Sequence, residues 1–369
     1  MRHQSLILVN SVYQLFTAMH IKRTLLAQET VDIILSDLLP AARTLGERLL
    51  QTALFNRVIY LNTASLTSRY LTGSLEEIAA GFAKANSLLA FALSAPLDQY
   101  DQIFFANPDT ASRMLAYTLR QDPAAFIWYE DGFSTYVIDF FKPSRVPANQ
   151  LAEGRALAEK IQRVLLYEPG LCLRGGAFKN AALPPIDPGD AALLSLYNFV
   201  FDYQPPALPE TFIFLEQSFR AEQLETNDRE LMQLCREHAG RAGFVVKPHP
   251  RVSGASAWEL GLSRPFPAPA ETPWELFLMN GDLDGKVLLT VCSSAALSSR
   301  LLFNRPLPTL LLYPLFRGRV LWKEDAVLRR YLRRFMQQYA PPCFYAPQTK
   351  FELAHIMRYY GAGSERTFS

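Results

Sequence analysis

Short apolar runs alternate with longer helical stretches along this chain, and that alternation limits its fold more than any other feature. In the first half, the runs are 5–9, 31–35, 57–61, 102–106, 125–128 and 164–167. They are rich in β-branched and aromatic residues, whereas Ala and Leu dominate the stretches between them. Strands that alternate with helices form βα units, whose strands lie parallel. The sequence therefore predicts an α/β fold with a parallel sheet.

A second βα series begins after a segment rich in turn-forming residues. Pro and Gly cluster between 175 and 209, and this density indicates a connection between domains. Further strands are predicted at 211–215, 244–246, 287–291 and 309–313. We therefore expect two domains and a final helix that closes back on them, with the boundaries 1–200, 201–345 and 346–369.

Composition excludes several classes of protein. Hydrophobic residues make up 49% of the 369 residues, which indicates a globular protein with large cores. The net charge of +2 gives no sign of nucleic acid binding. No apolar run approaches the roughly 20 residues that span a bilayer, and the N-terminus is not expected to be a signal peptide. The cysteines stand far apart and are expected to be reduced, as in a cytoplasmic protein: Cys172, Cys235, Cys292 and Cys343.

The most informative stretch is 243–252, GFVVKPHPRV. Its β-branched strand stops where the prolines begin, because proline cannot continue a ladder of hydrogen bonds. Ligands of open α/β sheets bind just beyond the carboxyl ends of strands. Lys247, His249 and Arg251 therefore form a predicted anion site, with Pro250 shaping the loop. A strand-ending turn with solvated basic residues is the simpler alternative.

Two serines, Ser293 and Ser294, follow strand 287–291 at the start of a predicted helix. The N–H groups and the dipole at a helix N-terminus favour phosphate, and hydroxyls add donors. A plain N-cap is the alternative. Because we expect the strand before His249 to be a neighbour in the same domain, we predict that the serines and the basic residues hold one anion together.

Polar residues also follow strands of the first domain. Glu130, Asp131 and Gly132 come directly after strand 125–128 and its Tyr129, which puts two carboxylates on a tight turn. Such a carboxylate can take a proton from an attacking hydroxyl when its surroundings raise its pKa; a solvated acidic turn is the alternative. Ser11, after the first strand, is either a ligand contact or a cap of the next helix.

Two further patterns concern metal and membrane. Asp282 and Asp284 spell DxD, which some sugar-transferring enzymes use to hold a divalent metal, but their setting, NGDLDGK, indicates a turn. We therefore predict no metal site. Basic residues interleave with apolar ones between 317 and 336, a pattern typical of a helix lying on anionic lipid. A solvated helix face packed on the other domain explains it equally well.

Taken in order, three motifs resemble those of bacterial sialyltransferases of the GT-B type: an acidic motif followed by Gly, an HP motif and a Ser pair. They are Glu130-Asp131-Gly132, the KPHPR of 247–251 and Ser293-Ser294. The KPHPR form and the opening LILVNSVYQLFTAMHI look most like glycosyltransferase family 52, which includes lipooligosaccharide α-2,3-sialyltransferases. The likeness covers most of the chain in order and spacing.

The resemblance implies two Rossmann-like domains with parallel sheets that face each other across a cleft. The N-terminal domain would be the acceptor side, and the C-terminal domain would bind the donor. The implied reaction is inverting transfer of sialic acid, or a related nonulosonic acid, from a CMP-sugar to a hydroxyl of a bacterial surface glycan, either lipooligosaccharide or capsule. Neither a metal nor a cofactor besides the CMP-sugar is implied.

The same resemblance implies roles for the site residues. His249, as a cation or an acid, would stabilise or protonate the departing phosphate. Lys247 and Arg251 would add charge or shape the loop, and Ser293 and Ser294 would hold the same phosphate. The implied partners are the CMP-sugar and a glycan acceptor. The location would be cytoplasmic, with peripheral contact to the membrane through the basic segment, and a homodimer stays open.

Two acids compete for the role of general base. Asp131 matches the base of relatives with an acidic motif in the first domain. In family 52 the base follows the first strand of the second domain, in a stretch like TQP…EDG. Here 215–222 is LEQSFRAE: Gln217 matches, the Pro and the EDG are missing, and Glu222 is the replacement. We prefer Asp131, with Glu222 second.

Other functions fit the same residues. One is a GT-B enzyme with another donor, CMP-Kdo or a UDP-sugar, or one that epimerises a nucleotide sugar. Another is a non-catalytic protein that binds sugar nucleotides in a polysaccharide assembly pathway.

Overall fold

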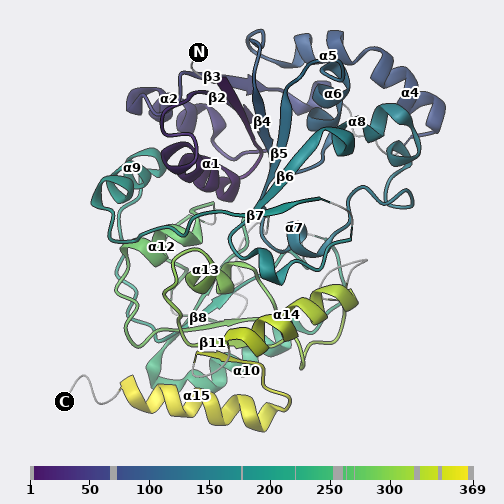
Figure 1. Ribbon diagram of the computed structural model, residues 1–369. Coiled ribbons are helices and arrows are strands. Elements are labelled where there is room, and N and C mark those ends of the chain that lie inside the picture. The colour runs from purple at the N-terminus through teal and green to yellow at the C-terminus, as the bar shows by residue number, and fades with distance from the viewer. Residues whose placement is uncertain are drawn as a thin grey trace. The chain divides into compact units, whose positions relative to one another are not determined.

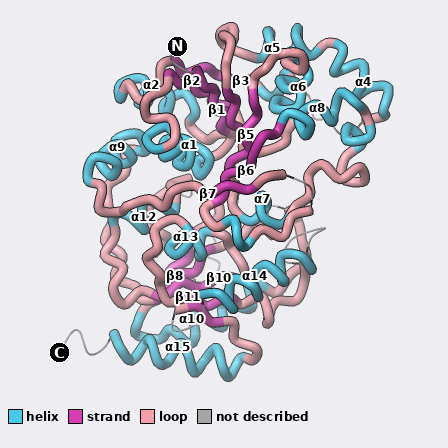
Figure 2. The backbone as a smooth tube through the Cα atoms, in the orientation of Figure 1, coloured by secondary structure: helices cyan, strands magenta, loops and turns pink. Residues whose placement is uncertain are grey.

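The computed structural model describes residues 4–66, 73–175, 178–220, 222–251, 261–262, 264–269, 271–319, 325–339 and 343–364. The chain forms two compact units. Unit 1 is Met1–Pro184 with Phe199–Phe201, and unit 2 is Pro185–Asn198 with Asp202–Ser369. Helix α9, Ala191–Phe201, is divided between them. Each unit contains a parallel sheet flanked by helices, which confirms the predicted α/β class (Figure 2).

The described sheet of unit 1 has seven strands in the order β3-β2-β1-β4-β5-β6-β7, all parallel. The strands are β1 Gln4–Val9, β2 Thr30–Ser36, β3 Arg57–Leu61, β4 Gln102–Phe105, β5 Ala125–Tyr129, β6 Ile161–Leu166 and β7 Asn180–Ala182. Most central positions are buried in succession, as expected for strands covered on both faces. The order reverses between β1 and β4, which makes this pair the switch point where α/β sheets bind ligands.

Helices cover both sides of this sheet, with α1 and α2 on one side and α4, α5, α6 and α8 on the other (Figure 1). The helices of unit 1 are α1 Val12–Thr24, α2 Ala42–Thr52, α4 Leu75–Ala83, α5 Ala85–Ala92, α6 Thr110–Thr118, α7 Phe133–Val137 and α8 Ala152–Lys160. Short 3-10 turns are η1 Thr63–Ser65, η2 Pro147–Gln150, η3 Pro169–Leu171 and, in unit 2, η4 Gly240–Ala242.

The described sheet of unit 2 has five parallel strands in the order β12-β11-β10-β8-β9. The strands are β8 Phe212–Leu215, β9 Phe244–Lys247, β10 Val287–Thr290, β11 Thr309–Leu311 and β12 Phe344–Tyr345. The expectation that the strands before His249 and Ser293 are neighbours is wrong, because β8 lies between β9 and β10. The chain crosses over β8 after β9, so the switch point of this sheet is the β8–β10 pair.

The helices of unit 2 include one that ends the described chain. They are α10 Asp228–Ala239, α12 Trp274–Asn280, α13 Ala295–Leu301, α14 Asp325–Tyr339 and α15 Lys350–Ser364. The last of them, α15, packs against α10 and the turn η4 of the same unit (Figure 1).

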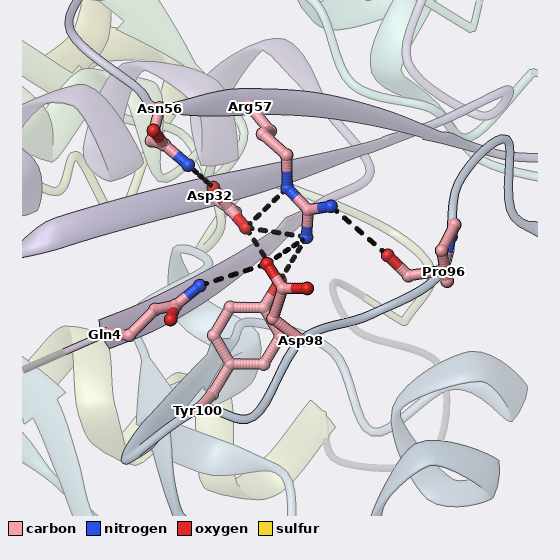
Figure 3. Close-up of polar contacts among 7 residues, drawn as sticks. All are labelled: Gln4, Asp32, Asn56, Arg57, Pro96, Asp98 and Tyr100. Atoms are coloured by element: carbon pink, nitrogen blue, oxygen red, sulfur yellow. Dashed lines mark hydrogen bonds and ion pairs between the residues drawn. The ribbon is translucent and has the colours of Figure 1, made fainter.

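A buried carboxylate ties three strands together at the amino edge of the sheet in unit 1 (Figure 3). Asp32 of β2 is fully buried and accepts hydrogen bonds from Asn56 Nδ2 at 2.9 Å, Arg57 Nε at 2.9 Å and the Tyr100 hydroxyl at 2.8 Å. Asn56 and Arg57 lie at the start of β3, and Tyr100 precedes β4. Since ligands bind at the opposite edge, we assign this cluster to stability.

Replacing Asp32 by Ala should lower the free energy of unfolding by roughly 3 kcal/mol, because the substitution leaves several donors without their buried acceptor. The matched control is Asp98→Ala. Asp98 also pairs with Arg57, at 2.9 Å, but its side chain is 52% exposed. An exposed pair of this kind contributes less than about 1 kcal/mol. Urea unfolding followed by circular dichroism checks both variants, and equal shifts of the midpoint would contradict the assignment.

Candidate functional site

The switch point of unit 1 is built from side chains that follow β1 and β4. Asn10 Nδ2 donates to Asp109 Oδ2 at 2.7 Å, and Asp109 also caps α6 by accepting from the Ser112 N–H at 2.8 Å. Burial raises the pKa of Asp109. Ser11 caps α1, since its hydroxyl accepts from the Gln14 N–H at 3.2 Å. Of the two readings of Ser11, the structure therefore shows the helix cap.

Glu130, directly after β5, is enclosed in the same edge of unit 1 and is only 2% exposed. Its carboxylate accepts from the hydroxyls of Tyr136 at 2.5 Å and Tyr13 at 3.2 Å, and from the Tyr167 N–H at 2.9 Å. Burial raises the pKa of Glu130 to about 7, although these hydrogen bonds lower it. Glu130 therefore joins α1, α7 and the end of β6, and its burial keeps it from being the solvated acid of a simple turn.

Asp131 lies beside this anchor and is half-buried. Its N–H donates to Thr135 Oγ1 at 2.8 Å, and its carbonyl accepts from the Ser134 hydroxyl at 2.8 Å. Gly132 has φ 61°, a left-handed value that favours glycine. The backbone of the acidic turn is thus fixed from both sides. Of the two adjacent acids, Asp131 is the one that solvent and a substrate can reach.

Gln217 joins the two central strands of unit 2 at their switch point. Its Oε1 accepts from the Cys292 N–H at 2.8 Å, and its Nε2 lies 3.3 Å from Cys292 Sγ. The hydroxyl of Thr290 adds a second link, because it donates to the Leu215 carbonyl at 2.9 Å. This edge of β8 and β10 is therefore held rigid where a ligand is expected.

His249 stands at this edge, after β9, and is half-buried. Its backbone N–H donates to the buried carboxylate of Glu216 at 3.3 Å, and its Nδ1 accepts from the Arg251 N–H at 3.1 Å. Burial, together with the charges of Arg251 and Lys247, lowers the pKa of His249 to about 4. A neutral imidazole whose Nδ1 is an acceptor carries its proton on Nε2. His249 is therefore a neutral hydrogen-bond donor through Nε2; of the two predicted forms, cation or acid, its lowered pKa disfavours the cation.

The side chain of Lys247, which is predicted to add charge or to shape the loop, is buried. Burial lowers the pKa of Lys247 to about 8, and the carboxylates of Glu275 and Glu271 oppose this effect. Its Nζ lies 5.8 Å from the ring centre of Phe266. Glu275 of α12 is also buried and accepts from the Ser298 hydroxyl at 2.9 Å. Lys247 thus supports the loop from inside the unit, while a direct contact with phosphate stays a prediction.

Arg251 and Glu222 are brought together on the outside of the loop. Arg251 Nη1 lies 3.8 Å from Glu222 Oε1, and both side chains are exposed. The Ser218 hydroxyl also donates to Glu222 Oε1, at 2.6 Å. Pro250 is exposed beside Arg251 in the turn. Val252, the last residue of the motif, lies outside the described residues.

Ser293 and Ser294 lie at the same edge, after β10, and both are half-buried. The Ser293 N–H is already engaged, since it donates to Thr290 Oγ1 at 3.1 Å. Ser294 occupies the N-cap of α13, and its side chain makes no capping hydrogen bond in the described part of the chain. The structure therefore offers the serine hydroxyls, rather than the Ser293 N–H, to a ligand.

The structure thus gathers the predicted residues in two places: Asp131 at the edge of unit 1, and His249, Arg251, Glu222 and the serines at the edge of unit 2. Sequence reasoning missed two supporting acids of unit 2, Glu216 and Glu275. The signal for Glu216 was its place directly after a buried strand. The signal for Glu275 was a charge enclosed by apolar neighbours in WELFLM.

The described residues also bear on the DxD pattern, on metal binding and on membrane-spanning helices. The predicted turn at 282–284 is confirmed, since the Asp284 N–H donates to Asp282 Oδ1 at 3.1 Å. Among those residues, no group of three or more His, Cys, Asp or Glu side chains could hold a metal ion. None of their helices is long and apolar enough to span a bilayer.

Only part of the basic segment, 325–336, lies in α14; Arg317 and Arg319 precede the helix in a loop, and residues 320–324 lie outside the described residues. Arg330, Arg333 and Arg334 are exposed on one face, and Arg329 pairs with Asp325 at 2.9 Å. The opposite face is buried and carries Leu328, Tyr331, Leu332 and Phe335. The helix is therefore amphipathic, which both readings of the segment require, and contact with lipid stays a prediction.

Because folding raises the pKa of Glu130, the carboxyl stabilises the fold most when it is protonated. This contribution is complete below the usual pKa near 4.3 and is lost as pH rises through about 7. Glu130→Gln mimics the protonated acid at every pH. We expect the stability of the wild type relative to this variant to fall between pH 5 and pH 8, by on the order of 3 kcal/mol.

Thermal unfolding of both proteins at these two pH values measures the change. The exposed Glu76→Gln serves as control and should give no such change relative to the wild type. A constant difference between the wild type and Glu130→Gln would show that the carboxyl is not held as described.

Comparisons with known proteins give similarity only at the level of structure. No protein-family model matches the sequence, and no curated protein does either. The α/β-galactoside α-2,3-sialyltransferase of the luminous marine bacterium Photobacterium phosphoreum is 10% identical, with a TM-score of 0.52 over 94% of this chain and 98% of that one.

Two other solved structures are similar to the same degree. A UDP-GlcNAc 2-epimerase from Methanocaldococcus jannaschii is 12% identical, with a TM-score of 0.53 over 97% of this chain and 93% of that one. LpCGTa in complex with UDP is 11% identical, with a TM-score of 0.53 over 98% and 91%. At such identities the likeness concerns the fold alone. With its two parallel sheets, the chain has the GT-B fold.

Proposed function

We propose that this protein is an inverting glycosyltransferase that moves sialic acid, or a related nonulosonic acid, from a CMP-sugar to a hydroxyl of a bacterial surface glycan. The observation that carries the proposal is the placement of His249 at the carboxyl edge of unit 2 near the switch point: its Nδ1 accepts from the Arg251 N–H at 3.1 Å, which leaves Nε2 to act on a ligand, and its pKa is lowered to about 4. The GT-B fold and the KPHPR and Ser-Ser motifs support the same reading.

The chemistry follows from charge. As the bond between the sugar and the phosphate breaks, negative charge grows on the phosphate oxygen. A donor already aimed at that oxygen stabilises the transition state more than the ground state. His249 supplies the donor through Nε2–H, and Arg251 and the hydroxyls of Ser293 and Ser294 supply further positive charge and hydrogen bonds. A CMP-sugar has one phosphate, so one such cluster suffices.

The acceptor hydroxyl must lose its proton as it attacks the anomeric carbon. Asp131 is our choice for the base, since its backbone is fixed by Thr135, Ser134 and Gly132 while its carboxylate is half-buried. The hydroxyl oxygen forms the new bond, the bond to the phosphate breaks, and the proton passes to Asp131. A single displacement of this kind inverts the anomeric centre. In the proposal neither a metal nor a cofactor takes part.

Replacement of His249 by Ala should lower CMP release from CMP-sialic acid by roughly 10²- to 10⁴-fold, because the departing phosphate loses its proton donor. A coupled assay for CMP measures the rate, and we expect the wild-type rate to be unchanged in EDTA. His355→Ala is the matched control, since His355 is exposed on α15. Normal turnover in His249→Ala would remove His249 from the mechanism.

The same protein tests the donor. Thermal shifts should be larger with CMP than with UDP or GDP at equal concentration. Preferential stabilisation by UDP would favour an enzyme that uses a UDP-sugar. Two of the similar solved structures suggest this alternative: the UDP-GlcNAc 2-epimerase and LpCGTa in complex with UDP.

Two substitutions separate the candidate bases. Asp131→Asn should reduce transfer roughly 10²- to 10⁴-fold and leave binding of CMP intact, because the base acts on the acceptor. Glu222→Gln should cost far less, since Glu222 is exposed and already paired with Arg251. Measured transfer rates and CMP affinities of both variants decide the point. The opposite order of rates would assign the base to Glu222.

A further inference from the structure

A cavity with a volume of 560 Å³ lies in unit 1, at the carboxyl ends of β2 and β3. The residues that matter for its chemistry are Leu35, Asp37, Arg43, Tyr60, Asn62 and Phe91. It lies along the same carboxyl edge of the sheet as Asp131, but none of its residues takes part in the proposed mechanism. Its size is that of a small-molecule site, which typically measures about 300 to 1,000 Å³.

The walls of this cavity are held in place before any ligand arrives. The Arg43 guanidinium lies 4.0 Å from the centre of the Tyr60 ring, and Gly46 leaves room for that ring, since a Cβ there would lie 2.3 Å from the Tyr60 hydroxyl. Asp37 accepts from the N–H of Thr63 at 2.9 Å and also from its hydroxyl. A fixed aromatic wall beside a fixed carboxylate lowers the ordering cost of binding.

An aromatic side chain of the cavity is left in solvent. Phe91 is 79% exposed, and Leu38, in the loop between Asp37 and Leu39, is 59% exposed. A large apolar side chain exposed beside a concave, partly polar surface is available to contact a ligand bound there. The aromatic residue thus extends the apolar part of the cavity beyond its walls.

The mixture of groups selects the kind of ligand. A sugar ring has one apolar face of C–H bonds and a rim of hydroxyls. The face would suit Phe91, and the rim would suit Asp37 and Asn62. Asp37 Oδ1 already accepts from Thr63, and Asn62 Oδ1 accepts from the Ala64 N–H at 3.1 Å. An acyl chain would cover the other polar atoms of both side chains without offering them a partner, which is costly.

Strand spacing sets the length of the ligand. Neighbouring strands lie about 4.8 Å apart, and the order β3-β2-β1-β4-β5 puts three steps between β2 and β5 and four between β3 and β5. The cavity and Asp131 are therefore separated by roughly 14 to 19 Å along one edge. A single sugar cannot occupy both places, whereas an oligosaccharide can.

We propose that this cavity is a second acceptor subsite, which binds a non-reacting sugar of an extended oligosaccharide acceptor. The inference rests on the proposed function, because it takes Asp131 as the place of the reacting hydroxyl. The subsite makes the enzyme select acceptors by length: the remote sugar contributes binding energy that a short acceptor lacks.

Isothermal titration without donor tests the subsite directly. The probes are disaccharides and tetrasaccharides that end in galactose, glucose or N-acetylglucosamine. We expect the wild type to bind at least one tetrasaccharide more tightly than its disaccharide. Phe91→Ala should reduce that advantage about 3- to 10-fold, the loss expected for one aromatic contact. Phe351→Ala, which removes an 89% exposed Phe from unit 2, is the matched control and should keep the advantage.

The outcomes separate this proposal from the proposed function. Phe91-dependent binding of a tetrasaccharide supports the subsite even when no transfer from CMP-sialic acid is found, and in that case only the proposed function fails. The subsite is overturned when no tetrasaccharide of the panel binds more tightly than its disaccharide. It is equally overturned when Phe91→Ala and Phe351→Ala behave alike.

Discussion

Parallel pairing is the constraint on which the rest of this structure depends. Parallel strands cannot be joined by tight turns, so each must be followed by a crossover that returns the chain to the other end of the sheet. Every strand therefore ends at the same edge, and the residues that follow the strands meet there. In unit 1 these include Asn10, Asp109 and Glu130, and in unit 2 they include Gln217 and His249.

Two buried acids fix the loops at these edges. Glu130 and Glu216 each follow a central strand directly, and each accepts a hydrogen bond from the backbone N–H of another loop, Glu130 from Tyr167 and Glu216 from His249. A carboxylate that is buried and bonded to backbone holds a loop in one arrangement, because losing the bond would leave the acid unsatisfied. The side chain proposed to react in each unit, Asp131 or His249, thus lies in a loop beside a buried acid and is not itself that acid.

Most strands, and the residues that meet at the carboxyl edge of each sheet, could be predicted from the sequence, whereas the order of the strands could not. Apolar runs such as those of β1, β5 and β9 stand out because strands of a parallel sheet are buried on both faces. The position of β8 between β9 and β10 was not predictable from local pattern, because order is decided by which side a crossover takes. The very short β12 was also missed, since its two residues have no period of their own.

Side-chain states in the site were the least predictable. Lys247 and His249 look alike in sequence, as basic residues around prolines. Lys247 is buried, and the carboxylate of Glu275, from a helix later in the chain, partly offsets the effect of burial on its pKa. His249 is neutral because of burial and of two nearby cations. The two cations near His249 lie in the motif itself, but the burial of both side chains depends on tertiary neighbours, which a pattern within ten residues cannot show.

The low pKa of His249 affects how this residue would interact with a bound phosphate. Burial first, and then the charges of Arg251 and Lys247, disfavour the protonated imidazole, so His249 stays neutral. An arriving anion would reverse the balance, because negative charge near an imidazole favours its protonated form. His249 would then begin as a hydrogen-bond donor through Nε2 and gain acid character as charge grows on the departing oxygen. Arg251 and Lys247, which disfavour protonation of His249, would also attract the anion that favours it.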